Sequence, residues 1–281
     1  MQKGLRNNWF KVVVLTLVVN LPCFATVSSS SCCIYNYYER DELYKNNFIY
    51  FLENGILKDV DYYIVIHGKS TVAIPKEENI TVFYKENKGF DFGAYGYALS
   101  KMNKDYNYYF FINSSVKGPY LKDKSKKWTD YFIALFNKDV KVVGTSINVY
   151  DWDFFSEFDL KKIYGHSAPF AHVQSMFFAI DHEYLTILKG MNFFNEEELN
   201  DFGSKEKVIA HKEFGLSQHA LQRKFNINCI LSKYKNIDYR TVKKNFDPIT
   251  NNGGDPYYKN SYFGATIDPF EVIFFKNARF N

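Results

Sequence analysis

One polar segment combines glycines with a carboxylate, a composition suited to holding a nucleotide-linked ligand. Residues 86–94 read Glu-Asn-Lys-Gly-Phe-Asp-Phe-Gly-Ala, so Asp91 lies between Gly89 and Gly93 and follows Asn87 closely. Glycine lets a backbone approach a ligand, and a carboxylate at such a turn accepts hydrogen bonds from ribose hydroxyls or base N–H groups. We therefore predict that these four residues bind the donor nucleotide. The Gly-x-Gly-x-x-Gly spacing of dinucleotide sites is absent.

A second segment ends an apolar strand in small polar residues. The run Tyr-Phe-Phe-Ile-Asn-Ser-Ser over residues 109–115 places Asn113 and Ser115 one residue apart. Many sugar-nucleotide enzymes carry two aspartates at this spot, which hold a divalent metal against the diphosphate. An amide and a hydroxyl can bind a sugar or a phosphate but are poor ligands for Mg²⁺ or Mn²⁺. We assign both residues to donor binding and predict no metal ligand, while the use of Mn²⁺ or Mg²⁺ stays open. A strand end followed by a turn is the alternative.

Candidate catalytic groups follow in the second half of the chain. Direct displacement by a sugar hydroxyl needs a base, and Glu213 is the first candidate, with Asp181 second. Glu213 is expected at the start of a helix, where the macrodipole favours a carboxylate, so capping alone would also explain it.

Acceptor binding is assigned to two other places. His172 and Gln174 lie two apart on a predicted strand and should share a face, although a satisfied core histidine is the alternative. Near the end of the chain, Asp255 and Tyr257 stand among turn formers and aromatic residues, which suits sugar rings but also a surface turn cluster.

The predicted strands and helices that carry these residues alternate along the chain. Strands are expected at 32–37, 61–68, 80–84, 106–112, 140–147 and 171–180, and helices at 43–52, 93–102, 128–136, 184–191 and 213–224. Such alternation predicts an α/β fold of Rossmann type, a mostly parallel sheet flanked by helices, whose site lies at the carboxyl ends of the strands. The mixed segment 149–169 is expected to be a long loop that covers the site as a lid.

Composition and charge narrow the function classes. The chain has 281 residues, 46% of them hydrophobic, which suffices for one large domain over residues 33–281. Its net charge is only +4, with 35 basic and 31 acidic side chains interleaved, so nucleic-acid binding is not expected. The four cysteines form no Cys-x-x-Cys pair, which argues against a zinc site.

The first 32 residues read as a targeting segment. A basic start is followed by the short apolar run 12–19 and by a serine tract at 28–31. This order predicts a cleaved signal peptide or a signal-anchor, and with it a secretory or membrane-associated protein with possible membrane contact. If the segment is instead an extension of a cytosolic enzyme, the protein is cytoplasmic.

Together, these motifs resemble glycosyltransferases related to the rhamnan-synthesis F proteins. The resemblance runs over residues 33–276 and rests on five segments: 35–39, 51–55, 87–94, 111–119 and 172–176. It implies a GT-A fold, a nucleotide-sugar donor and transfer of a hexose or deoxyhexose to a glycan acceptor in polysaccharide or surface-glycan synthesis. By this resemblance Asp91 contacts the donor nucleoside, and Asn113 and Ser115 occupy the metal-motif position, where both differ from the two-aspartate pattern.

Two functions from different classes therefore remain. In the leading hypothesis, an enzyme binds its donor with Tyr35, Asp91 and Asn113 and its acceptor with His172, Gln174 and the aromatic tail. The alternative is a catalytically silent glycan-binding module on the same fold, suggested by the missing metal acids. A glycoside hydrolase would need two facing carboxylates, and the sequence nominates no such pair.

Overall fold

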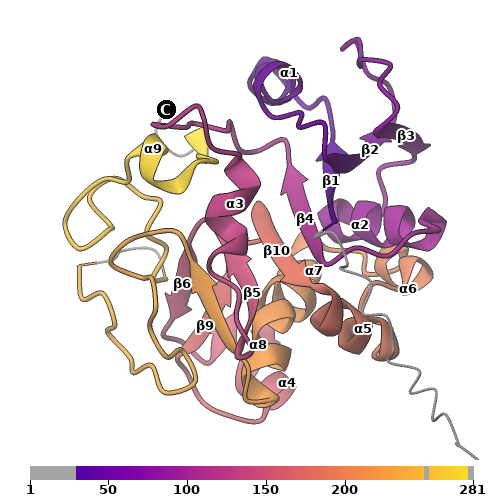
Figure 1. The fold of residues 1–281 in the computed structure, drawn as a ribbon. Coiled ribbons are helices and arrows are strands. Elements are labelled where there is room, and N and C mark those ends of the chain that lie inside the picture. The colour runs from indigo at the N-terminus through magenta and orange to yellow at the C-terminus, as the bar shows by residue number, and fades with distance from the viewer. Residues whose placement is uncertain (1–29, 250–252, 278–281) are drawn as a thin grey trace, which may run out of the picture.

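The computed structural model describes residues 30–249 and 253–277, and its centre is a seven-stranded sheet (Figure 1). The strand order is β11-β5-β10-β4-β1-β2-β3. The strands are β1 Ser31–Tyr37, β2 Val60–His67, β3 Ile80–Lys85, β4 Tyr108–Asn113, β5 Val140–Gly144, β10 Phe177–Asp181 and β11 Asn226–Cys229. All neighbouring pairs run parallel except those that β10 makes with β4 and β5. The predicted α/β fold with a mostly parallel sheet is confirmed.

Aromatic side chains of the central strands alternate between the two faces of the sheet and select the helices that cover each face. Phe110 and Phe177 pack against Trp128 and Phe132 of α3 (Trp128–Ile133). Their chain neighbours Phe111 and Phe178 stack on each other with centroids 4.4 Å apart. These rings meet Tyr95 of α2 (Phe90–Lys101) on the opposite face. The period of two along each strand therefore determines which residues can reach which layer.

Helix α1 (Glu42–Asn54) lies on the same face of the sheet as α3. Its Phe48 and Phe51 pack on Tyr35, which projects from β1 toward this helix. The helix begins where Asp41 accepts a hydrogen bond from the Tyr44 N–H at 3.0 Å, an N-cap interaction. The opposite face carries α2 together with α5 (His182–Gly190) and α8 (Phe214–Gln222), as Figure 1 shows.

Two predicted strands are each divided between two sheets. In segment 140–147, β5 ends at Gly144. The next strand, β6 (Ile147–Tyr150), belongs to a separate sheet with β9 (Phe170–Val173). Segment 171–180 likewise divides into β9 and β10, and residues 174–176 connect them. Polar residues lie at both breaks, Thr145 and Ser146 at the first and Gln174 and Ser175 at the second, and all four are buried. A few polar residues within a long apolar run do not by themselves reveal a change of sheet.

The segment predicted as a lid is instead a folded part of the molecule. Residues 149–169 contain β7 (Phe154–Phe155), β8 (Phe158–Asp159) and α4 (Leu160–Tyr164). Leu160 and Tyr164 form a small second core with Phe170 and Phe214. Since none of this segment lines the main cavity, the prediction of a covering loop was wrong.

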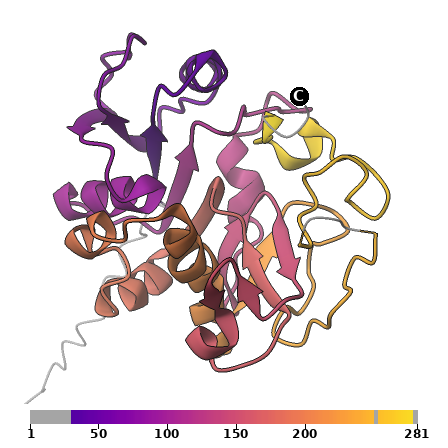
Figure 2. The same ribbon diagram turned by 180° about the vertical axis from the view of Figure 1, so that it is seen from behind.

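A continuous helical stretch crosses the site side of the sheet. After α6 (Glu196–Asn200), the chain forms α7 (Lys205–Val208), a π-helical turn η1 (Ile209–Glu213) and then α8. Beyond β11 the chain runs in long loops to α9 (Pro269–Val272), which Figure 2 shows from behind. Phe275 then pairs with Lys117 in an isolated bridge, and this brings the last described residues back to the loop after β4.

The predicted targeting segment falls almost wholly outside the described residues. Of residues 1–32 only 30–32 are described, and Ser31 and Cys32 belong to β1, so this strand includes two residues before the predicted boundary at 33. Within the described ranges, no helix has the length and apolar character needed to cross a membrane.

Candidate functional site

A cavity of about 350 Å³ opens at the carboxyl ends of β1, β2 and β4, facing α2 and the α7–η1 helical stretch. This is the edge of a parallel sheet where ligands are expected, and the volume lies in the range of small-molecule sites. Its lining is mixed, with amides, hydroxyls, two carboxylates, two lysines and several aromatic rings. The lining residues are Asn36, Tyr38, Tyr44, His67, Asn87, Phe90, Asp91, Phe92, Asn113, Ser114, Ser115, Gln174, Ser175, Met176, Lys205, Val208, Ile209, Glu213 and Lys276.

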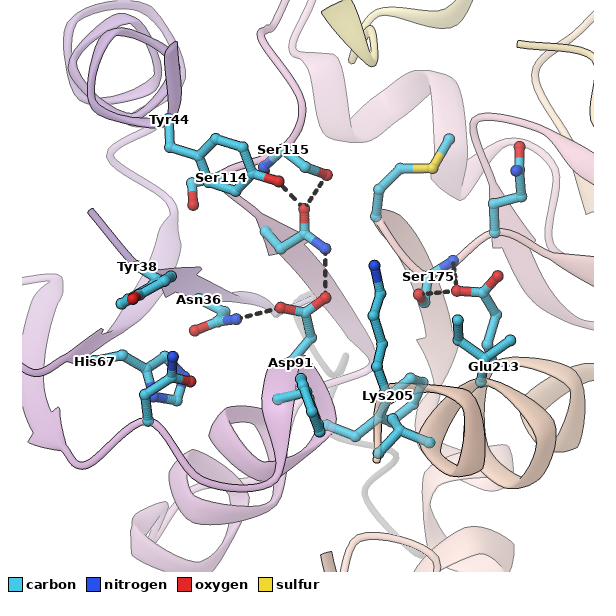
Figure 3. A pocket seen from close by; sticks show the side chains of 18 of the residues that line it. Asn36, Tyr38, Tyr44, His67, Asp91, Ser114, Ser115, Ser175, Lys205 and Glu213 are labelled. Carbon is cyan, nitrogen blue, oxygen red and sulfur yellow. Dashed lines mark hydrogen bonds between the residues drawn. The ribbon is translucent and has the colours of Figure 1, made fainter. Parts of the chain in front are cut away.

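Two asparagines and one aspartate form the floor of the cavity. Asn36 and Asn113 are register partners in the parallel β1–β4 pair, so their side chains emerge side by side on one face of the sheet. Asn36 Nδ2 donates to Asp91 Oδ1 at 2.6 Å, and Asn113 Nδ2 donates to Asp91 Oδ2 at 2.7 Å. Asp91 stands in the first turn of α2, so the network joins two strands to a helix N-terminus (Figure 3).

Burial and hydrogen bonding act on Asp91 in opposite directions. Burial raises the pKa of its carboxyl above the ordinary value, while the hydrogen bonds from Asn113 and Asn36 lower it. Both carboxylate oxygens accept an amide N–H, which is the pattern of an ionised group. Asp91 is therefore a fixed acceptor that organises the floor.

The residues at the metal-motif position are already satisfied by each other. Asn113 Oδ1 accepts hydrogen bonds from the backbone N–H and the hydroxyl of Ser115, at 3.0 and 2.5 Å. A divalent cation would need anionic oxygens here, and this pair offers none. In the part of the chain that the structure describes, no cluster of three or more His, Cys, Asp or Glu side chains is placed to hold a metal ion. A divalent metal does not fit this donor set.

Glu213 forms the opposite wall of the cavity. Its Oε2 accepts a hydrogen bond from the hydroxyl of Ser175, and its Oε1 lies 3.7 Å from His172 Nε2. Burial raises the pKa of Glu213, but the hydrogen bonds and charge of His172, the Ser175 hydroxyl and the charge of Lys276 lower it further, to about 2. Glu213 ends the π-helical turn inside a continuous helical stretch, so the predicted helix-start position was wrong and capping does not explain it. π-Turns of this kind are frequent at functional sites.

Two lysines, Lys205 and Lys276, line the same cavity. Figure 3 shows the Lys205 side chain extending between Asp91 and the Ser175–Glu213 pair. Lys276 reaches the cavity because the Phe275–Lys117 bridge holds the chain beside the loop after β4. Burial lowers the pKa of Lys276, and the charges of Glu213 and Asp91 oppose that effect. Among the described residues, neither lysine side chain has a hydrogen-bond or ion-pair partner.

The β1–β2 end of the cavity carries acceptors and aromatic rings. Asn36 Oδ1 and His67 Nε2 are buried without a partner among the described residues. The His67 Nδ1 lies 3.2 Å from the carbonyl oxygen of Glu86 and donates to it, which leaves Nε2 as an acceptor, and burial lowers the pKa of this imidazole. Tyr38 stands 41% exposed at the rim. An unpaired buried acceptor costs about 1–3 kcal/mol, so this end favours a ligand that donates N–H groups.

Six of the residues assigned from the sequence meet in this cavity. They are Asn87, Asp91, Asn113, Ser115, Gln174 and Glu213. Tyr35, the aromatic residue assigned to donor binding, points to the other face of the sheet and packs on α1. Its neighbour Asn36 faces the cavity instead. Because successive residues of a strand face opposite sides of the sheet, an assignment displaced by one residue selects the wrong face.

The two glycines of the first motif serve packing and not ligand contact. Gly89 caps α2 with φ of +77°, a conformation that favours glycine. A Cβ on Gly93 would lie 2.5 Å from the Lys88 carbonyl oxygen. Neither glycine lines the cavity, although together they place Asp91 at its floor.

Four other assigned residues lie outside the cavity. His172 is buried behind Glu213 and acts through it. Asp181 lies at the far end of β10, where it caps α5 through the Tyr184 N–H and pairs with Lys141 at 2.7 Å. Asp255 and Tyr257 are 4% and 0% exposed, and the Tyr257 hydroxyl donates to the Phe274 carbonyl. We therefore withdraw Asp181 as a base and the Asp255–Tyr257 segment as a glycan surface.

Several lining residues were missed by sequence reasoning. Ser175 and Met176 reach the site because antiparallel β10 starts beside the end of β4, where the Asn113 N–H donates to the Met176 carbonyl at 3.1 Å. Lys205 begins the short helix α7 and Lys276 follows an isolated bridge, and neither lies in an element predicted from the sequence. The only sequence signal for Asn36 and His67 was a polar residue near the end of a buried strand.

Comparison with known proteins leaves the family unassigned. No family model matches the sequence, and no curated protein matches it. A mannosyltransferase from Pyrobaculum calidifontis, solved with GDP-Man and Mn²⁺, is similar over 70% of this chain at 9% identity and a TM-score of 0.42. This chain spans only 53% of that protein.

Two further solved structures are similar at the same low level. A glycosyltransferase involved in glycosylation of the major capsid of PBCV-1 matches over 65% of this chain and 74% of its own, at 10% identity and a TM-score of 0.35. The 4-diphosphocytidyl-2C-methyl-D-erythritol synthase from Anaerococcus prevotii matches over 75% and 90%, at 12% identity and a TM-score of 0.38. Since these TM-scores are below 0.5, we draw no conclusion about activity from them.

Proposed function

We propose that the protein is a glycosyltransferase that moves a hexose or deoxyhexose from a nucleotide-sugar donor to a glycan acceptor. One observation carries the proposal: a cavity at the carboxyl ends of three parallel strands holds the Asn36–Asp91–Asn113 network on one side and Glu213 on the other. Nucleotide-linked ligands bind at this edge of α/β sheets. A pocket with fixed acceptors and one opposing carboxylate suits a ligand with a nucleoside at one end and a reacting centre at the other.

The donor would lie along the cavity with its base at the β1–β2 end. Tyr38 offers an aromatic face for stacking, and the buried acceptors Asn36 Oδ1 and His67 Nε2 lie nearby for base N–H donors. The ribose then falls near Asp91, whose side chain is held by two amides. In this orientation of the donor, the sugar would lie toward Glu213 and Gln174.

Glu213 is the proposed base. It would take the proton of the acceptor hydroxyl as that oxygen bonds to the anomeric carbon, while the bond from the anomeric carbon to the diphosphate breaks and the electron pair leaves with the nucleotide. A pKa of about 2 makes it a weak base before donor binds. A bound diphosphate would raise that pKa, since it adds negative charge and occupies the nearby lysines.

A glycoside hydrolase is the second candidate, because Asp91 and Glu213 share the cavity and their pKa values are shifted in opposite directions. A hydrolase would need one protonated carboxyl as general acid. Both oxygens of Asp91 accept amide N–H groups, an arrangement that stabilises the ionised carboxylate over the protonated acid. This geometry favours the transferase.

The place of action is proposed from the sequence alone. Residues 1–32 suggest a secretory or membrane-associated protein, and a cytoplasmic enzyme follows if they are not a signal. The resemblance to rhamnan-synthesis F glycosyltransferases supports polysaccharide or surface-glycan synthesis as the process.

The direct test is donor turnover across a panel of UDP-, GDP- and TDP-sugars, followed as release of nucleoside diphosphate with and without glycan acceptors. We expect turnover with at least one donor and a loss of at least about 100-fold in Glu213→Gln. The matched control is Glu53→Gln, on exposed surface of α1. Release of sugar from glycans without any nucleotide would instead support the hydrolase.

A further inference from the structure

The described lining of the cavity contains two cations and no cluster of three or more side chains suited to a divalent metal. The Asn113–Ser115 pair is neutral and internally bonded, and both oxygens of the neighbouring Asp91 already accept amide N–H groups. Glu213 is occupied by Ser175 and faces His172. A diphosphate in this cavity would therefore meet no metal ligand set but two ammonium groups.

The two ammonium groups are placed to take a ligand. Neither Lys205 nor Lys276 has a side-chain partner among the described residues, although each acts electrostatically on Asp91. They come from opposite parts of the fold, since Lys205 starts α7 and Lys276 follows the bridge at Phe275. Charges that converge from separate elements on one cavity, unpaired there, form an anion site.

We propose that Lys205 and Lys276 together hold the diphosphate of the donor in the place that a divalent cation takes in metal-dependent enzymes. The inference rests on the proposed function and identifies the class of that site as metal-independent. The diphosphate of a nucleotide sugar carries two negative charges, which two ammonium groups balance. When the bond to the sugar breaks, the leaving nucleoside diphosphate gains a further negative charge, and fixed cations stabilise that charge as it develops.

A purely structural role for the lysines makes a different prediction. The positive charges of both lysines also offset that of Asp91, and the charge of Lys276 offsets that of Glu213. If that were their only role, removing one would change stability without a selective effect on phosphate binding. The difference in affinity between a nucleoside diphosphate and its nucleoside isolates the phosphate contribution and so separates the two roles.

The test is calorimetric titration of GDP against guanosine and of UDP against uridine, first in EDTA and then in MnCl₂. We expect at least one diphosphate to bind in EDTA at least about tenfold more tightly than its nucleoside. Lys205→Met and Lys276→Met should each remove most of that difference and leave nucleoside affinity unchanged. Lys138→Met, an exposed lysine outside the cavity, is the matched control and should behave as wild type.

Three results would overturn the inference or its basis. Diphosphate binding that requires Mn²⁺ and is unaffected by the lysine variants overturns the inference and leaves the proposed transferase intact. Binding in EDTA that both lysine variants retain also overturns it. Absence of nucleotide binding in either buffer would defeat the proposed function itself. Because Lys205 is exposed at the start of α7, its variant remains informative even if Lys276→Met fails to fold.

Discussion

Asn113 Nδ2 donates a hydrogen bond to Asp91 Oδ2 at 2.7 Å and so joins the end of β4 to the first turn of α2. The same amide accepts from Ser115 through its oxygen, so every polar atom of this side chain is used within the protein. The cavity floor is therefore preformed by neutral groups around one carboxylate. An aspartate at position 113 would place two carboxylates in contact.

Asn113→Asp should destabilise the protein. It replaces a donor to Asp91 with a like charge in a buried site, for which a loss of about 2–4 kcal/mol in unfolding free energy is expected. Urea denaturation at pH 7 measures it, with the exposed Asn103→Asp as the matched control. If the double variant Asn113→Asp/Ser115→Asp regains stability on addition of Mn²⁺, the position can hold a metal once acids are present. Wild-type stability in Asn113→Asp would contradict the assigned hydrogen bond.

Glu213 should make stability depend on acid pH. Its pKa is lowered from 4.5 to about 2, so its contribution is complete above about pH 4.5 and is lost as the pH falls toward 2. The side chain keeps 20% exposure. Solvent screening therefore limits the expected effect to about 1–3 kcal/mol. Between pH 6 and pH 3, the unfolding free energy of the wild type should fall more than that of Glu213→Gln. Parallel pH dependences would show that the carboxylate is not stabilised by His172 and Ser175.

Gly93→Ala should be costly because of a close backbone contact. The added Cβ would lie 2.5 Å from the Lys88 carbonyl oxygen, a backbone atom that cannot rotate away. We expect a loss of about 1–3 kcal/mol in unfolding free energy and a weaker nucleotide site, since the shift moves the first turn of α2. Gly190→Ala is the matched control, because nothing lies within 4 Å of a Cβ there. Equal stability of the two variants would contradict the packing role.

Phe90 combines backbone strain with an exposed ring at the cavity. Its φ is +53°, and 40% of the residue is exposed. A bulky residue in this conformation costs of order 1 kcal/mol, which suggests that the ring is kept for ligand contact. Phe90→Gly should change unfolding free energy by less than about 1 kcal/mol and weaken donor binding about tenfold. Thermal unfolding and calorimetry measure the two effects, and unchanged affinity would exclude the contact.

The sequence predicted the fold and the floor of the site because both depend on local pattern. The glycine-flanked turn placed Asp91, and a buried apolar strand ending in polar residues placed Asn113, at one edge of the sheet, where both line the cavity. The choice of Tyr35 over Asn36 failed because apolar content on both faces of β1 hides which residue faces which layer. A strand buried on both faces shows no alternation of apolar and polar residues, so its sequence does not indicate which residues face the cavity.

Residues that reach the site through tertiary connections could not be predicted. Lys276 depends on a bridge between Phe275 and Lys117, and Ser175 depends on the antiparallel placement of β10 beside β4. The tail residues Asp255 and Tyr257 had the composition of a sugar-binding surface but are buried in the fold. Composition indicates chemical capacity, whereas exposure is decided by packing that the local sequence does not encode.

Whether this cavity binds the nucleotide of an activated sugar is measured by titration of UDP, GDP and TDP into the wild type and Asp91→Ala. At least one nucleotide should bind to the wild type, and Asp91→Ala, shown to be folded by its thermal transition, should weaken that binding at least about tenfold. Binding of an oligosaccharide without binding of any nucleotide would instead identify a catalytically silent glycan-binding module.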